Sequence, residues 1–579
     1  MDEEVDVLVI GAGISGLAFA STYLGVHPNT NLLLVEKEAI VGGTWNQRRL
    51  YDHFYTQWSV GFGEFSQQRM RVPPAEDQYW GLFKAKHTTN YLEEFANNQT
   101  FAGRSLKDRV RFSSQVINAQ RYGDGWRMDL QDVNSSRAHT ISARKLILAS
   151  GLTSIPSVPQ LKGRENFTPE ILHNIDFGSS GVLADPKVKH ITVLGGGKSG
   201  ADMVYASVKA GKEVAWIVRP SGTGPCTFVD ANGKAGFNNA FELASTRAVE
   251  ALQPSYFATR NWWTNFLHRT KIGLGLSRKL WDGAHAQAVA SADYANRPAK
   301  GDFGKLVPHS PLFWRNNAAG IVNHSDFYEM IATFVDSYYD ELQELEGNTI
   351  RLGSGRTIQT DTLLLGTGWQ DSLSYLAPSL RAELGLPYPL KSESQLDQGQ
   401  ILAAKQWSQR EHEADAKIVE KYPLLAEPPQ HVRSPTTESP YRLYNLVVPV
   451  DDPSHSFAVV GMLGTTNYFR TGEAQALWIT AYFDGRLTLP AVDERKDDVA
   501  HFVAWCRRRY LSTGNDGNSV NFDTLRYTDR LFEQLGLVSH LKTGWSYFFS
   551  PNTAQDYAGL QKEYIEKYGN LKATVTGVQ

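Results

Sequence analysis

The sequence predicts an α/β fold that contains two Rossmann-like units, and three observations support this prediction. The 579 residues are 41% hydrophobic and nearly balanced in charge, which is the composition of a globular protein. A pattern of strand, glycine-rich turn, helix and strand begins at residue 5, and it begins again at residue 190. The chain is also long enough for more than one domain, since a domain usually holds about 100–200 residues.

Composition and motifs exclude several classes of protein. The net charge is -3 with both signs interspersed, so we expect no nucleic-acid partner, because that binding depends on neutralising phosphates. No apolar run reaches the roughly 18–20 residues that span a bilayer, so we expect no membrane anchor. The acidic start lacks a secretory signal, and Cys226 and Cys506 form no CxxC motif. We therefore expect a cytoplasmic protein without a metal site.

The first unit starts with the apolar strand 5–10 and continues into a glycine turn and a helix. Gly11 permits the tight turn, Gly13 lets the backbone approach a pyrophosphate, and Gly16 allows close packing of helix on strand. The next apolar strand ends in Glu36, whose carboxylate accepts hydrogen bonds from a ribose diol and repels a 2′-phosphate. This unit is expected to bind FAD or NAD and not NADP; an accidental glycine turn is the alternative.

The second unit repeats the pattern but ends in a basic residue. The strand 191–194 leads into a glycine turn, a helix and the strand 213–218, after which Arg219 stands where an NAD site would carry a carboxylate. A guanidinium suits a 2′-phosphate, which favours NADPH; a solvated surface charge is the alternative. Lys198 is a further candidate for the phosphates, or else an ordinary exposed lysine. The expected cofactor-binding residues here are Gly195, Gly197, Lys198, Ser199, Gly200, Arg219 and Ser221.

Several motifs together resemble those of the class B flavoprotein monooxygenases, the family of flavin-containing and Baeyer–Villiger monooxygenases. The two glycine turns, with Gly43, Thr44 and Trp45 after the first, look like the family's FAD and NADPH halves. The segment 167–177 resembles the family's linker signature, although Pro169 replaces its usual glycine. Gly368 belongs to a segment similar to the family's later strand end, and Glu473-Ala-Gln475 is similar to a pattern in flavin-containing monooxygenases.

The resemblance also divides the chain into three parts. Residues 1–165 are expected to form the first part of an FAD-binding domain, and residues 166–370 an NADPH-binding domain. The remaining residues, 371–579, would complete the FAD-binding domain and add a C-terminal helical segment. The stretch of about 222–323 is too long for a simple connection, so we expect a helical insertion there.

Three residues are candidates for contact with the reacting groups. Gln57 stands where a family asparagine contacts the flavin side of the pocket, with an ordinary loop glutamine as the alternative. His173 belongs to the linker-like segment and is a candidate for contact with NADP, or else a structurally satisfied histidine. Arg470 is a candidate cation for the pocket, or a structural arginine. Asn467 lies in a loop before a helix near Glu473, and we expect this loop to bind flavin through backbone N–H groups; an ordinary turn is the alternative.

The resemblance implies that NADPH reduces FAD and that O2 then forms a C4a-(hydro)peroxyflavin, which gives one oxygen atom to a small organic substrate. The arginine of Baeyer–Villiger members is not evident in the comparable stretch 344–350, which favours a nitrogen or sulfur substrate atom. Baeyer–Villiger oxygenation of a ketone stays open, as does a non-catalytic nucleotide-binding flavoprotein. A disulfide reductase is excluded because the chain has no redox cysteine pair.

Overall fold

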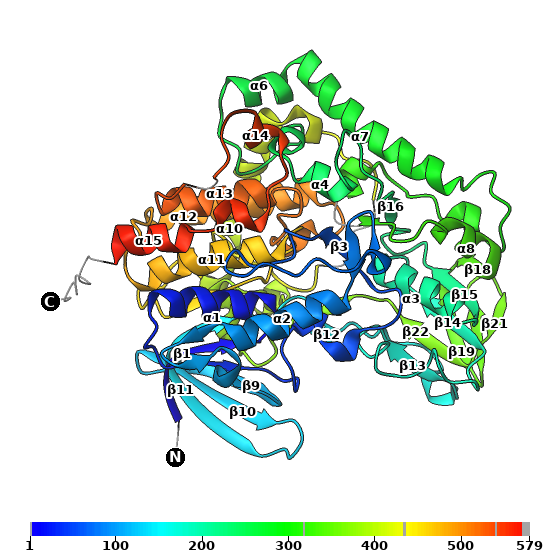
Figure 1. The fold of residues 1–579 in the computed structure, drawn as a ribbon, viewed down its shortest axis with the longest axis horizontal. Helices are drawn as coiled ribbons and strands as arrows, with labels where there is room; N and C mark the ends of the chain where they lie inside the picture. The colour runs from blue at the N-terminus through cyan, green and yellow to red at the C-terminus, as the bar shows by residue number, and fades with distance from the viewer. Residues whose placement is uncertain (1–2, 316–318, 432–435, 539–540, 570–579) are drawn as a thin grey trace.

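The computed structural model describes residues 3–315, 319–431, 436–538 and 541–569. Its two main sheets lie at opposite sides of the molecule in Figure 1, with helices packed between and above them. The predicted α/β fold class is therefore confirmed. Within these described ranges, no helix combines the length and the apolarity needed to cross a membrane.

The first sheet has seven strands in the order β8-β2-β1-β11-β10-β9, and β26 pairs with β11 beyond the end of β10. Strands β1, β2, β11 and β26 run parallel, so their carboxyl ends meet at one edge. Helix α1 joins β1 to β2 and packs against the buried helix α11. The bounds are β1 (Glu3–Ile10), α1 (Ile14–Val26), β2 (Leu32–Val35), β8 (Val110–Arg111), β9 (Ser114–Tyr122), β10 (Gly125–Asp132), β11 (Ala138–Leu148), β26 (Phe457–Val459) and α11 (Tyr468–Phe483).

The second sheet contains five strands, all parallel, in the order β13-β22-β14-β15-β18. Helix α3 connects β14 to β15, just as α1 connects β1 to β2. Both predicted strand–helix–strand units are thus present. The bounds are β13 (Glu170–His173), β14 (His190–Leu194), α3 (Lys198–Lys209), β15 (Glu213–Val218), α8 (Phe327–Phe334), β18 (Val335–Tyr339) and β22 (Thr362–Leu365).

Between β15 and α8 the chain forms a largely helical excursion, of which α6 and α7 lie along the upper edge of Figure 1. Its first and last strands pair with each other in parallel, so its two ends lie side by side. Helices occupy the stretch in which a helical insertion was expected. The helices are α4 (Ala240–Ala244), α5 (Arg247–Glu250), α6 (Trp262–Arg269) and α7 (Lys271–Ala292), and the two strands are β16 (Thr227–Val229) and β17 (Ala319–Ile321).

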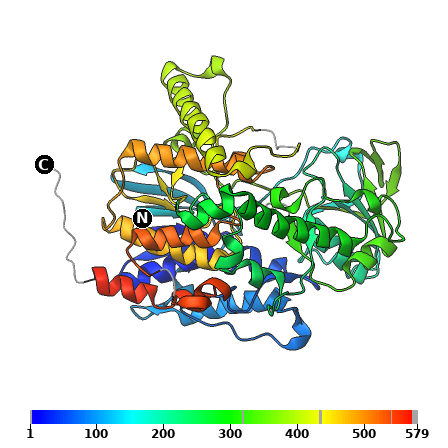
Figure 2. The ribbon, with the colours of Figure 1, turned by 90° about the horizontal axis from the view of Figure 1, so that it is seen from above.

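The last third of the chain is mainly helical, and Figure 2 shows α10 projecting from the body. Helix α11 begins at Tyr468, earlier than the predicted start near Glu473, because the Asn467 side chain accepts the N–H of Arg470 and caps the helix. The helices are α9 (Pro378–Leu384), α10 (Gln398–Lys421), α12 (Val492–Arg509), α13 (Thr524–Gln534), α14 (Gly544–Phe549) and α15 (Leu560–Tyr568).

Smaller elements complete the fold. A hairpin-like sheet of β3, β5 and β4 lies beside α4, and β12 pairs with β23 near the second sheet. A three-stranded sheet, β19-β20-β21, precedes β22. The bounds are β3 (Tyr55–Ser59), β4 (Gln78–Tyr79), β5 (Leu82–Lys84), α2 (Lys86–Asn98), β12 (Ile155–Pro156), β19 (Leu342–Glu346), β20 (Thr349–Leu352), β21 (Thr357–Gln359) and β23 (Trp369–Gln370).

A buried ionic cluster joins the insertion to the C-terminal helices. Asp529 of α13 pairs with Arg247 of α5, whose second nitrogen lies 2.9 Å from the carboxylate, and with Arg470 of α11 at 3.2 Å. Burial raises the pKa of Asp529, but the Arg247 hydrogen bond and the nearby arginine charges outweigh it and lower the pKa overall. The carboxylate therefore compensates two guanidinium groups that have almost no contact with solvent.

We predict that Asp529→Asn strongly destabilises the protein. Breaking a buried ion pair leaves an uncompensated charge and costs about 3–5 kcal/mol. Chemical denaturation followed by intrinsic fluorescence measures the effect. Asp415→Asn is the control, because it breaks a pair with Arg508 that is partly exposed and worth about 0–1 kcal/mol. Equal stabilities of the two variants would contradict the prediction.

Candidate nucleotide-binding sites

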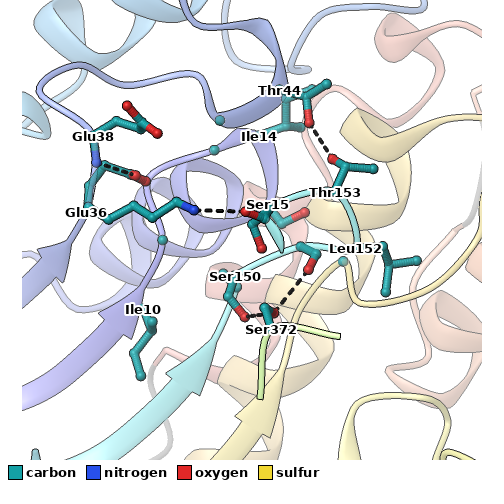
Figure 3. Close-up of a pocket in the computed structure, with 18 of the residues that line it drawn as sticks. Ile10, Ile14, Ser15, Glu36, Glu38, Thr44, Ser150, Leu152, Thr153 and Ser372 are labelled. Atoms are coloured by element: carbon teal, nitrogen blue, oxygen red, sulfur yellow. Dashed lines mark hydrogen bonds between the residues drawn. The ribbon is translucent and has the colours of Figure 1, made fainter. Parts of the chain in front are cut away.

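A cavity of about 290 Å³ lies where the parallel strands of the first sheet end. Ile10, Val35 and Ala149 bring the ends of β1, β2 and β11 to its wall, and Gly461 follows β26. Figure 3 shows residues of these segments converging on one space. In α/β sheets, ligands bind in such a crevice at the carboxyl ends of the strands.

The glycines of the first turn are required by close backbone approaches. Gly11 has φ +107°, and a Cβ there would lie 2.5 Å from the carbonyl oxygen of Ala149. A Cβ on Gly16 would lie 1.9 Å from the carbonyl oxygen of Gly11. Gly13 is different, because its nearest atom would be Gly43 Cα at 3.6 Å. The turn therefore requires glycine at positions 11 and 16. Gly13 lines the cavity, and its missing side chain leaves room there.

Helix α1 points its amino end at this cavity. Gly13 is the N-cap and offers no side chain, and the first helical hydrogen bond runs from Leu17 to Gly13. The N–H groups of Ile14, Ser15 and Gly16 precede that bond and have no partner within the helix. An amino end of this kind favours anionic groups through its N–H groups and its dipole. The site therefore fits a pyrophosphate.

Glu36 follows β2 and lines the cavity beside this turn. Its carboxylate accepts the N–H of Ala12 at 2.8 Å and that of Glu38 at 3.0 Å. Burial raises the pKa of Glu36, and these two N–H donors oppose the rise. Each carboxylate oxygen keeps a further lone pair, so the group can accept hydrogen bonds from a ribose diol. Gly43, Thr44 and Trp45 also line the cavity, whereas Asn467 and Gly368 do not.

Several residues that line the cavity were not predicted from the sequence. Lys37 donates to the Ser154 carbonyl at 2.8 Å, and Arg49 donates to the Thr153 carbonyl at 2.9 Å. Burial lowers the pKa of both Lys37 and Arg49. Thr44 and Thr153 share a hydrogen bond of 2.7 Å, which Figure 3 shows. The position of Lys37 next to Glu36 could have identified it, but no local signal distinguishes Arg49.

The second glycine turn repeats the geometry of the first. Gly195 has φ +133°, and a Cβ there would lie 2.3 Å from the Gly366 carbonyl oxygen. A Cβ on Gly200 would lie 2.2 Å from the carbonyl oxygen of Gly195. Gly197 is the N-cap of α3, and a Cβ there would meet nothing within 4 Å. The chain therefore contains two matching phosphate-binding turns, residues 11–16 and 195–200, which we call the first and second cradle. Each lies at the amino end of a helix, and in the second the N–H groups of Lys198, Ser199 and Gly200 have no partner within the helix.

The two cradles differ in charge at the end of their second strand. Arg219 follows β15 and is exposed, and among the described residues no carboxylate pairs with it. Ser221 lies beyond it, with its N–H donated to Glu341 at 2.8 Å. Arg219, which is basic and exposed, thus stands at the place in the second unit that the buried Glu36 holds in the first.

Comparisons with known proteins agree with this architecture. The family model for L-lysine 6-monooxygenase/L-ornithine 5-monooxygenase matches residues 80–229. The FAD-dependent monooxygenase rstn6 of Aspergillus nomiae is 31% identical, over 97% of this chain and 98% of its own length. An FAD-dependent monooxygenase of Pyrenophora dematioidea is 32% identical, over 93% and 98%.

The chain belongs to the FAD-dependent monooxygenases. The fold also matches cyclohexanone monooxygenase from Rhodococcus sp. Phi1 bound to NADP+, with a TM-score of 0.59, 16% identity, and coverage of 93% of this chain and 98% of that one. Tmm from Pelagibacter sp. matches with a TM-score of 0.53, 14% identity, and coverage of 99% and 95%. The predicted resemblance to class B flavin monooxygenases is thereby confirmed, and the non-catalytic alternative is wrong.

In this monooxygenase, Gln57 and Lys198 meet at Asn323. The Gln57 amide accepts the N–H of Ile321 at 2.6 Å and donates to Asn323 Oδ1 at 3.1 Å. The same Asn323 oxygen accepts Lys198 Nζ at 2.8 Å, and Lys198 also pairs with Asp202. Neither Gln57 nor Lys198 lines the cavity. The observed contacts instead connect β3 to the amino end of α3 through Ile321 and Asn323, at the end of the insertion.

His173 is also held by backbone groups. One ring nitrogen lies 3.0 Å from the Gly368 carbonyl oxygen, and the other accepts the N–H of Ile175 at 3.3 Å. Burial lowers the pKa of His173, which keeps the ring neutral. Its edge packs on Trp369. A contact of His173 with NADP stays a prediction that these interactions do not support.

Arg470 lies inside the ionic cluster and not at the cavity. Besides Asp529, its guanidinium donates to Thr528 at 2.7 Å and lies 4.9 Å from the centre of the Tyr557 ring. A pocket cation at this position has no support in the geometry, because the side chain is 1% exposed and engaged elsewhere. Gln475, from the predicted Glu473-Ala-Gln475 motif, supports the cavity wall instead. Its side chain accepts the N–H of Gly461, a wall residue, at 2.8 Å.

We predict that Gly13→Ala lowers FAD affinity without unfolding the protein. The new methyl group contacts only Gly43 in the folded chain, but it lies at the cavity wall, where we expect the pyrophosphate to bind. An overpacking cost of about 1–3 kcal/mol lowers affinity roughly tenfold to hundredfold. Flavin absorbance per protein and thermal unfolding of the flavin-free chain measure the two effects. Gly16→Ala is the contrasting variant, in which both flavin content and stability should fall.

Proposed function

We propose that this enzyme is an NADPH- and O2-dependent monooxygenase that transfers one oxygen atom to a nitrogen or sulfur of a small organic substrate. The observation that carries the proposal is the pair of matching cradles with opposite charges. The acidic one, with Glu36, excludes a 2′-phosphate, whereas the basic one, with Arg219, attracts it. One chain would thus bind FAD and NADPH at separate sites.

The residues of the first cradle would hold FAD. The amino end of α1 binds the pyrophosphate, Gly13 leaves room for it, and Glu36 accepts the ribose hydroxyls. Arg49 and Lys37 add positive charge along the wall. FAD, when bound, supplies the electron transfer and the activation of oxygen, while the protein supplies orientation and electrostatics.

Water must be kept from the reacting groups, and aromatic side chains provide that wall. Trp45 and Trp58 both line the cavity, with ring centres 4.8 Å apart. Phe54 stacks on Trp45 at 5.4 Å and Phe469 packs on Trp58 at 5.9 Å. A packed aromatic wall of this kind would limit the access of water and so suppress side reactions with solvent.

The match to lysine and ornithine monooxygenases over residues 80–229 favours nitrogen as the substrate atom. The likeness to cyclohexanone monooxygenase concerns the fold. Both cysteines are buried thiols, which suits a reducing compartment, so we propose a cytoplasmic location.

Arg219→Gln should lower kcat/KM for NADPH and leave that for NADH unchanged. A hydrogen bond to a charged group contributes about 1.5–3 kcal/mol, so the loss should be roughly tenfold to hundredfold. Steady-state oxidation of the two coenzymes measures it. Arg351→Gln, on β20 of the same domain, is the matched control and should change neither value. A parallel loss for both coenzymes in Arg219→Gln would count against this assignment.

The substrate atom is tested with isotopically heavy O2. Purified enzyme, NADPH and a panel of amines, sulfides and ketones are incubated, and the products are analysed by mass spectrometry. We expect one heavy oxygen atom in amine or sulfide products. Esters or lactones from the ketones would establish Baeyer–Villiger oxygenation instead, and NADPH oxidation that yields only hydrogen peroxide with every substrate would overturn the proposed transfer.

A further inference from the structure

Helices α6 and α7 lie at the upper edge of the molecule in Figure 1. They expose large apolar side chains. Trp262 is 76% exposed and Trp263 is 42% exposed, both in the first turn of α6. Ile272 and Leu276, in the first two turns of α7, are 69% and 46% exposed. Such groups of exposed apolar side chains mark interaction surfaces. We call the exposed face of residues 260–279 the α6–α7 face.

The same face is strongly basic, although the whole chain is slightly acidic. Residues 251–281 contain no aspartate or glutamate. Arg260 pairs with Glu420 at 3.0 Å, but no described carboxylate pairs with the other four cations. These exposed, unpaired cations are Arg269, Lys271, Arg278 and Lys279.

Apolar and basic side chains lie next to each other along one side of α7. Ile272, Leu276 and Lys279 are spaced by four and three residues and therefore share a face, with Lys271 and Arg278 beside them. The opposite side carries the buried Gly273, Ser277 and Trp281. An apolar stripe bordered by cations, with tryptophans at its end, is typical of helices that lie in the interface of a membrane.

The α6–α7 face is held in place by the body of the protein. His268 is buried and bonds the Ala251 carbonyl at 3.1 Å, and the Ser277 hydroxyl donates to the carbonyl of Leu252. Thr270 caps α7 by accepting the N–H of Gly273. The surface is thus formed before any partner arrives, so that binding requires little ordering of the helices.

We propose that the α6–α7 face docks the enzyme on the surface of an anionic lipid bilayer. The cations would contact the head groups while Trp262, Trp263 and Ile272 enter the boundary below them. Charge argues against a second copy of this chain as the occupant, because a symmetric contact would bring the unpaired cations of both copies together. The attachment is peripheral and needs no helix that spans the membrane.

Vesicle flotation of the FAD-loaded enzyme tests this proposal. Vesicles of phosphatidylcholine with phosphatidylserine should carry the protein at low salt, and phosphatidylcholine vesicles should carry much less. A triple variant, Lys271→Gln with Arg278→Gln and Lys279→Gln, should bind on the order of 100-fold more weakly, since each cation contributes about 1 kcal/mol. Trp262→Ser should weaken binding at least roughly tenfold, which corresponds to burial of one large apolar side chain.

Trp545→Ser in α14 is the matched control. Trp545 is 81% exposed, but it lies outside the α6–α7 face. The control should bind vesicles like the natural enzyme, and all variants should keep their flavin content, which shows that they fold. The proposal is overturned if the natural enzyme does not float with anionic vesicles, if the triple variant binds equally well, or if Trp545→Ser loses as much binding as Trp262→Ser. A dimer in sedimentation that Trp262→Ser abolishes, without vesicle binding, would also overturn it.

Discussion

The close contact between a helix amino end and a strand end is the constraint on which the site depends. In both cradles the first glycine touches the carbonyl of the neighbouring strand, and the last glycine touches the carbonyl of the first. No side chain fits at Gly11, Gly16, Gly195 or Gly200. Because the helix starts directly at the strand end, its unpaired N–H groups face the crevice between the strands, where a phosphate can reach them.

The spatial relation of the two cradles depends on contacts far from either glycine turn. Asn323 accepts hydrogen bonds from Gln57 of β3 and from Lys198 of α3. On the other side of the insertion, Asp529 joins Arg247 to Arg470. The insertion therefore contacts both halves of the enzyme through polar groups. Since hydrogen-bonded groups tolerate little displacement, these contacts orient one cradle relative to the other.

The net charge of the whole chain does not describe the charge of each part of its surface. A net charge of -3 argues against anionic partners, yet the 251–281 stretch has no acidic residue and forms a basic, partly apolar face. The run without acidic residues is visible in the sequence. The exposure of this stretch is not visible in the sequence, because tryptophans in a helix are equally compatible with a buried core. The fold turns Trp262 and Trp263 outward while it buries His268.

The sequence by itself determined both strand–helix–strand units, the glycine turns and the acidic residue after β2, because these features depend on the spacing of neighbours in the chain. Only the tertiary structure decided which distant segments complete the first cavity, such as the one with Ser372 and Tyr375. It also decided that Arg470 is internal, because its partner Asp529 lies 59 residues away in the sequence. A long polar side chain suits either a ligand or a buried ion pair, and only the packing of α11 on α13 selects between them.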